Sequence, residues 1–245
     1  MHKALWGHEE WLVCAHSSAP GRIVGGAGKT LRDICPSFPL LIKKICADQR
    51  LSVQVHPNDE TAKTVGGEPK TEMWCVLKPG PIFAGFRPGV TNQDVGRAVA
   101  NDTLEELLVR FDAKAGECYF IPGGLVHAIG EGTSVYEVQQ SSDTTFRLYD
   151  WERVGADGKP RQLQVKEGHA AMDVTLPPPV PSDSVKCKYF EFGKVQSDLR
   201  LSASILQPSA WRVVYDPAAD DCVLLPPGGT GAVAPGAFIT RILNV

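Results

Sequence analysis

The stretch LSVQVHPND, residues 51–59, alternates apolar and polar side chains with the two-residue period of a β-strand. This period divides its side chains between two faces, with Ser52, Gln54 and His56 on one and Leu51, Val53 and Val55 on the other. Three polar side chains in a row on one face need a wet or metal-filled cavity. A half-exposed edge strand shows the same alternation, so both interpretations of this face stay open.

Short apolar runs of this kind recur along the chain. The sequence has 24 glycines and 19 prolines, which form turn signals such as PGG at 122–124, ADG at 156–158 and PPGG at 226–229. This cadence predicts an all-β fold, with helical pattern confined mainly to 91–111. The predicted strands are 38–45, 51–56, 71–77, 117–121, 134–140, 144–150, 187–193, 200–206, 211–215, 222–225 and 237–243.

A proline-rich segment divides the chain. TLPPPVPSDS, residues 175–184, holds four prolines, which exclude it from a central strand. We therefore expect a linker at 175–184 between a metal-binding catalytic domain, 1–174, and a small C-terminal β domain, 185–245. All six histidines precede the linker, so a histidine-based site is expected in the first domain.

Composition argues against nucleic-acid and membrane partners. The 25 Lys+Arg and 28 Asp+Glu residues leave a formal charge of -3, without the basic excess that nucleic acid or anionic lipid requires. The apolar run 38–46 is broken by Lys43 and Lys44, and the first residues are too polar for a signal peptide. Seven singly spaced cysteines without a C-x-x-C pair indicate reduced thiols. We expect a soluble, cytoplasmic protein that acts on a small molecule, with its oligomeric state left open.

The segment PKTEMWCVL, residues 69–77, has the same alternation. It aligns Lys70, Glu72 and Trp74 on one strand face. Alone, a Lys/Glu pair of this kind is most often a surface ion pair of small energetic weight.

A third segment adds a histidine. In YFIPGGLVHAIGEG, residues 119–132, an apolar strand runs into a Pro-Gly-Gly turn and presents His127 just beyond it. A lone histidine is more often a packed or exposed residue than a ligand. Two histidines, a glutamate and a glutamine on successive strands of one small barrel instead favour a metal site.

Four motifs together carry a family resemblance. QVHP at 54–57, KTEMW at 70–74, PGGLVHA at 122–128 and EVQQSSDTTFRLYDW at 137–151 follow the order and approximate spacing found in type I phosphomannose isomerases. The chain resembles the short bacterial form of that family over roughly residues 35–170. The resemblance implies a cupin-type β-barrel, or jelly roll, with a second, smaller, degenerate cupin-like β domain and a few short helices. It also implies a zinc-dependent aldose–ketose isomerase that interconverts mannose 6-phosphate and fructose 6-phosphate.

Site residues follow from the resemblance, position by position. The implied ligands of one zinc ion per chain are His56, Glu72, His127 and Gln54, and the implied catalytic residues are Arg147, Glu137 and Lys70. Imidazole nitrogen and carboxylate oxygen are donors that zinc accepts. Isomerisation passes through an enediolate, which needs a proton carrier and nearby positive charge. Glu137 is favoured as the carrier because a carboxylate is basic at neutral pH, whereas an amine is protonated. Lys70 and Ser52 are then candidates for binding the sugar phosphate.

Other interpretations fit parts of the pattern. Histidine–carboxylate sites on this barrel serve several metals, so a cupin enzyme acting on another sugar, or an iron-dependent oxygenase, stays open. A non-catalytic sugar-binding regulator is a further alternative. For Arg147 the alternative to catalysis is an ion pair with Asp143 or Asp150, both near it in sequence.

Overall fold

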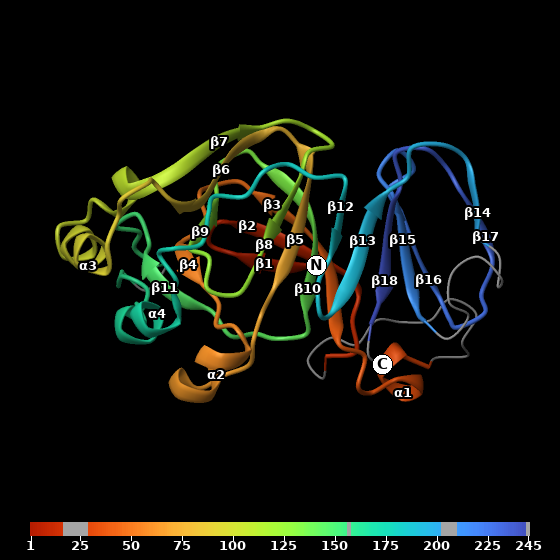
Figure 1. Cartoon of the computed structure of the whole chain (residues 1–245), viewed down its shortest axis with the longest axis horizontal. Coiled ribbons are helices and arrows are strands. Elements are labelled where there is room, and N and C mark those ends of the chain that lie inside the picture. Colours follow the sequence, from red (N-terminus) through yellow and green to blue (C-terminus); the bar gives the residue numbers. More distant parts are fainter. Residues whose placement is uncertain (17–28, 156–157, 202–209, 244–245) are drawn as a thin grey trace. The chain divides into compact units, whose positions relative to one another are not determined.

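A computed structural model gives the architecture of residues 1–16, 29–155, 158–201 and 210–243 (Figure 1). Contacts within the chain divide it into two units. Unit 1 comprises Met1–Glu10 and Lys44–Pro181, and unit 2 comprises Trp11–Lys43 and Ser182–Val245.

Two sheets contain the strands that bear the candidate site. The first is built from β1 (His2–Ala4), β2 (Gly7–Val13), β3 (Leu40–Ala47), β5 (Glu72–Lys78), β8 (Cys118–Ile121) and β10 (Ser134–Gln140), in the spatial order β1-β2-β3-β10-β5-β8. The second is built from β4 (Val53–Val55), β6 (Gly80–Phe86), β7 (Leu108–Ala113), β9 (His127–Ile129) and β11 (Phe146–Tyr149), in the order β11-β4-β9-β6-β7. The pairs β10–β5, β5–β8, β11–β4 and β4–β9 are antiparallel.

A buried apolar cluster joins these two sheets. Trp74 and Val76 of β5 pack in it together with Ile82 of β6 and Ile129 of β9. The sheets therefore face each other across this cluster, and alternation directs every second residue of each strand into the space between them.

The outer face of the second sheet packs on helices. Val53 and Val55 lie there in a cluster with residues of α3 (Asn92–Ala100) and α4 (Val165–Ala171). This agrees with the predicted alternation of these two valines. Leu51 belongs instead to the inner cluster, because it precedes the first residue of β4.

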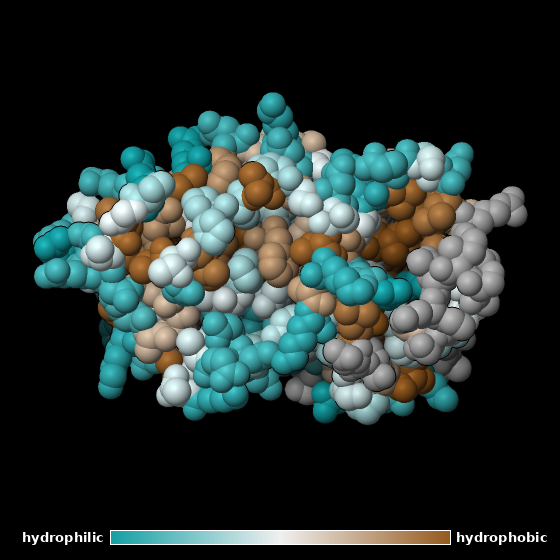
Figure 2. All heavy atoms as spheres, viewed as in Figure 1, coloured by the Kyte–Doolittle hydropathy of each residue, from teal (hydrophilic) through white to brown (hydrophobic). Residues whose placement is uncertain are grey.

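Two further helices and a 3₁₀ turn complete the helical content of the described segments. They are α1 (Leu31–Ile34), α2 (Asp59–Val65) and η1 (Leu104–Leu107). The Asn58 side chain caps α2 by accepting hydrogen bonds from the Glu60 and Thr61 amides. No residue of α2 is buried, and hydrophilic side chains cover it in Figure 2. Across the part of the chain that the structure describes, no helix has the length and apolar character needed to span a membrane.

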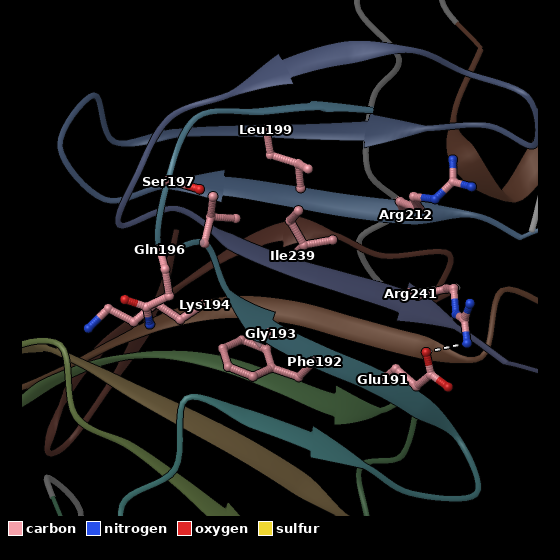
Figure 3. A pocket seen from close by; sticks show the side chains of 11 residues that line it. Glu191, Phe192, Gly193, Lys194, Gln196, Ser197, Leu199, Arg212, Ile239 and Arg241 are labelled. Carbon is pink, nitrogen blue, oxygen red and sulfur yellow. Dashed lines mark ion pairs between the residues drawn. The ribbon is translucent and has the colours of Figure 1, made fainter. Parts of the chain in front are cut away.

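Unit 2 contributes two smaller sheets. One holds β12 (Ser184–Lys186), β13 (Phe190–Lys194), β15 (Arg212–Asp216), β16 (Asp221–Leu225) and β18 (Phe238–Ile242), in the order β12-β13-β18-β15-β16, and the other pairs β14 (Leu199–Leu201) with β17 (Gly231–Val233). A cavity of about 410 Å³ lies along β13 and β18. Its wall combines apolar Leu199 and Ile239 with the Glu191–Arg241 ion pair (Figure 3).

The all-β prediction is confirmed, with two corrections. The strands form separate sheets where a closed barrel was expected. The helical region predicted at 91–111 contains two short helices, α3, capped by Thr91, and η1, which begins after Thr103. Its last residues differ from the prediction, because the chain becomes extended at Leu108 and β7 pairs with β6. Most of the predicted strand at 200–206 and the predicted turn at 156–158 lie outside the described residues.

The domain boundaries at 174 and 185 stay a prediction. The chain passes from unit 1 to unit 2 inside the proline-rich segment, between Pro181 and Ser182. The contacts also assign residues 11–43 to unit 2, and this division falls within β2 and β3.

A disulfide corrects the prediction that the thiols are reduced. Cys75 of β5 and Cys118 of β8 are direct partners in the strand register and are bonded to each other, with Cα atoms 4.1 Å apart. They lie 43 residues apart in sequence, so no short spacing reveals the pair. Alternation directs Cys75 to the face of β5 opposite Glu72 and Trp74.

Candidate metal centre

Three buried side chains of unit 1 converge between the two facing sheets. Glu72 is the first residue of β5, His127 is the first residue of β9, and His56 directly follows β4. Each is 1% exposed. One potential ligand atom from each lies within 4.8 Å of the other two. The structure therefore brings together three of the four predicted metal ligands.

Backbone carbonyls orient both imidazole rings. Nδ1 of His56 lies 2.8 Å from the Thr144 carbonyl oxygen, and Nδ1 of His127 lies 2.8 Å from the Leu125 carbonyl oxygen. Because a carbonyl oxygen only accepts, we assign the ring proton to Nδ1 in both cases. Each Nε2 is then left with a lone pair, the arrangement typical of histidines that bind metals.

Both Nε2 atoms approach the same carboxylate. His56 Nε2 lies 3.1 Å from Glu72 Oε1, and His127 Nε2 lies 3.9 Å from Glu72 Oε2. The His127 Nε2 atom is buried and has no hydrogen-bond partner among the described residues. A buried nitrogen without a hydrogen-bond partner is rare, and here its lone pair points to a bound electron-pair acceptor such as a metal ion.

Burial sets the charge state of this cluster. It lowers the pKa of His56 to about 3, with the Lys70 charge as the next cause, and it also lowers the pKa of His127. Burial raises the pKa of Glu72, but Lys70 and His56 outweigh it and hold this pKa well below its ordinary value. At neutral pH the cluster therefore presents two neutral imidazoles and one carboxylate, as metal ligation requires.

Lys70 touches the cluster directly. Its Nζ atom lies 2.8 Å from Glu72 Oε1 and 3.2 Å from His56 Nε2, and the residue is 6% exposed. The predicted alignment of Lys70 with Glu72 on one strand face thus corresponds to a buried contact and not to a surface ion pair.

Trp74 links Glu72 to Glu137. Its indole Nε1 donates to Glu72 Oε2 at 3.0 Å and to Glu137 Oε2 at 3.1 Å. Trp74 and Glu137 are register partners on β5 and β10, and both are buried. The strand alternation of residues 69–77 places Trp74 on the face of Glu72, and this was the available signal for a role that its residue type alone does not indicate.

A second row of polar residues crosses the opposite sheet. Arg147 of β11 pairs in register with Gln54 of β4, which pairs in turn with His127 of β9. Residues directly opposite each other share a face, so these three lie on one side of the sheet. Among the described residues no hydrogen bond joins Gln54, or the buried Ser52, to the cluster.

Arg147 does not form the ion pair considered as the alternative to catalysis. Asp150 accepts instead from Arg161, whose Nε lies 2.6 Å from Oδ2. Arg147 Nη1 donates to the Gln162 carbonyl oxygen at 2.9 Å, while its Nε is buried without a partner in the described segments. Burial, and then the charge of Arg161, lower the pKa of Arg147.

The Pro-Gly-Gly turn before His127 contacts the other ligand segments. The Gly124 amide donates to the His56 carbonyl oxygen at 2.8 Å, and the Gly123 amide donates to Thr71 Oγ1 at 3.3 Å. A Cβ atom on Gly123 would lie 2.7 Å from the Pro57 carbonyl oxygen. Only glycine permits this approach of two backbone segments.

Gly123→Ala is therefore expected to destabilise unit 1 by about 1–3 kcal/mol, the range typical of overpacking against a fixed neighbour. Urea unfolding at neutral pH measures the change. Gly193→Ala is the control, because a Cβ atom there meets nothing within 4 Å. Equal unfolding midpoints for the two variants would show that the close approach carries no strain.

Comparison with known proteins extends these observations. No family model matches the chain. It is 38% identical over 237 residues to "Mannose-6-phosphate isomerase ManA" of Bacillus subtilis (strain 168), covering 84% of this chain and 74% of that protein. It is 30% identical over 211 residues to a mannose-6-phosphate isomerase of Streptococcus mutans, covering 72% of this chain and 67% of that protein.

A solved structure shares the fold. The crystal structure of the mannose 6-phosphate isomerase from Bacillus subtilis superposes with a TM-score of 0.76 at 23% sequence identity. The match covers 96% of this chain and 89% of that one. The architecture described above is therefore also found in a protein of known structure.

Proposed function

This chain belongs to the type I mannose-6-phosphate isomerase family, and on that premise we propose that it interconverts mannose 6-phosphate and fructose 6-phosphate with one zinc ion per chain. The observation that supports this most strongly is the buried cluster of His56, Glu72 and His127. A relative's activity alone leaves the chemistry open, whereas these three donors between facing sheets supply a site for it.

The residues present fit zinc. Two neutral imidazoles and one carboxylate form a donor set that zinc binds in catalytic sites, with another position left for water or substrate. The unpartnered Nε2 of His127 supports this assignment, since zinc would satisfy it. Gln54, in register with His127, is proposed as the fourth ligand. When bound, zinc supplies a Lewis acid that polarises a sugar oxygen.

Glu137 is proposed to move the proton. Aldose–ketose isomerisation removes a proton from the carbon next to the carbonyl and returns it to the neighbouring carbon. Glu137 is 2% exposed and tied through Trp74 to Glu72, so its carboxylate is held beside the ligand cluster. Lys70 and Ser52 are proposed to bind the substrate, Lys70 because its ammonium group already lies among the ligands.

Arg147 is proposed to stabilise the enediolate. It shares its sheet face with Gln54 and His127, and its Nε has no acceptor among the described residues. A guanidinium in a half-buried position stabilises developing negative charge more strongly than it would in water.

The proposed activity is tested by a coupled assay for fructose 6-phosphate formed from mannose 6-phosphate, run with and without a chelator. We expect turnover that the chelator removes and added zinc restores. If the protein turns over only another sugar phosphate, the proposed substrate is wrong and the chain is an isomerase of that sugar. Full activity in zinc-free protein would contradict the metal assignment.

Removal of the metal is expected to leave the protein folded. The apolar clusters on both faces of the second sheet contain no metal ligand, so the sheets retain their packing. Zinc at a free concentration of 100 times its Kd would add about 2.7 kcal/mol of stability. Far-UV circular dichroism and thermal melting with and without chelator measure both effects. A chelated protein with the spectrum of an unfolded chain would contradict this expectation.

A further inference from the structure

Trp74 makes hydrogen bonds and a ring contact to the candidate site in addition to its packing in the apolar cluster. Its N–H reaches the carboxylates of Glu72 and Glu137, and its ring meets the ring of His127 edge to face, with centroids 5.2 Å apart. One side chain thus touches two proposed metal ligands and the proposed proton carrier.

The shared N–H constrains both carboxylates. Indole has one N–H donor and no acceptor, so its hydrogen-bond partners must be acceptors. An ionised carboxylate accepts hydrogen bonds and donates none. The two Oε2 atoms lie no farther apart than the sum of their distances to Nε1, which are 3.0 and 3.1 Å. Two buried carboxylates this close repel each other when both are ionised, and a donor positioned between them offsets part of the repulsion.

The indole is itself held rigidly. Trp74 is 1% exposed and packs in the apolar cluster between the sheets, which also contains Ile121 and Ile129. A donor whose rotamer is fixed by packing orients its acceptors, whereas a mobile donor follows them. With Oε2 of Glu72 held by Trp74, Oε1 is directed to His56, 3.1 Å away.

We propose that Trp74 is a positioning residue whose one N–H couples the metal ligand Glu72 to the proton carrier Glu137. This inference rests on the proposed function. It adds that metal affinity and proton transfer share one donor, so that loss of this donor alters both.

Trp74→Phe tests the inference, because it deletes the N–H and keeps an aromatic ring in the cluster. Partners of metal ligands typically contribute 10–100-fold to metal affinity, and we expect zinc affinity to fall on the order of tenfold. At saturating zinc, kcat should also fall several-fold while KM for mannose 6-phosphate stays near that of the wild type. Competition with a chromophoric chelator measures the affinity.

Trp6→Phe is the matched control. Trp6 packs against the same apolar cluster but is only partly buried, and none of its described contacts reaches a site carboxylate. It makes the same change from indole to phenyl and should keep the zinc affinity and kcat of the wild type. If Trp74→Phe matches Trp6→Phe in both quantities, or lowers only the melting temperature, the coupling role is wrong. Zinc-free, inactive wild-type protein would instead overturn the proposed function.

A measurement on the metal-free protein keeps the inference testable if Trp74→Phe does not fold. The chain has five tryptophans, so ¹⁵N-labelled indoles give few resonances to follow. Glu137→Gln replaces a charged acceptor with a neutral one and should shift one indole proton resonance. Addition of zinc to the wild type should move the same resonance through Glu72. Indole spectra that are identical before and after Glu137→Gln would overturn the proposal.

Discussion

His127→Ala is expected to yield a folded protein without bound zinc and with isomerase activity lowered by roughly 1,000-fold, since Lewis-acid stabilisation contributes several kcal/mol to such a reaction. The reason is the Nε2 atom, which is buried, without a partner in the described structure, and 3.9 Å from Glu72 Oε2.

Zinc content by elemental analysis and kcat on the same preparation measure this result. His169→Ala serves as the control, because His169 lies on α4 and its ring approaches Gly96, outside the cluster. Melting curves establish that both variants are folded. Full zinc occupancy in His127→Ala would remove this residue from the site and leave the metal to other ligands.

Arg147→Ala is expected to lower kcat by roughly 100-fold or more, because a donor aimed at charge that develops in the transition state typically contributes this much. Zinc content should stay normal, since Arg147 lies in the row beyond Gln54 and is no ligand. Arg147→Lys should recover only part of the loss, because it keeps the charge but not the planar, two-pronged donor.

The alternative for Arg147 is a structural role, through its hydrogen bond to Gln162. That role predicts a lowered melting temperature with kcat per folded molecule nearly intact. Arg110→Ala is the matched control, because Arg110 forms an exposed pair with Asp112 on β7. Measuring kcat, KM, zinc content and melting temperature on each preparation separates the two roles.

The parts of the fold that were predictable are those with a local signal. Two-residue alternation is visible within one strand, so the shared face of Val53 and Val55, opposite that of Gln54 and His56, could be predicted without knowing any partner. The strand GPIFAGF at 80–86 was missed because its glycines and proline disfavour a strand and it has no alternation. The leucines at 104, 107 and 108 have helical spacing, yet Leu108 pairs with Phe86, and this tertiary contact prevails.

The candidate site divides in the same way. Alternation and family motifs identified the side chains that converge, because each candidate ligand lies within a short motif that can be recognised by itself. The partners that orient them were not predictable: the carbonyls of Thr144 and Leu125 are backbone atoms, which leave no mark on residue type. The Cys75–Cys118 bond likewise depends on the register of two strands that are distant in sequence.

The three proposed ligands come from both facing sheets, Glu72 from one and His127 from the other, with His56 just beyond β4. A bound ion would therefore also link the two sheets to each other. Any partial opening that separates β5 from β9 dismantles the site before the chain as a whole unfolds. The free metal concentration in the surroundings then sets how rarely such openings occur, because each one must first release the ion. At a low free metal concentration the protein would lose its metal ion, and with it the restraint on partial opening of the two sheets.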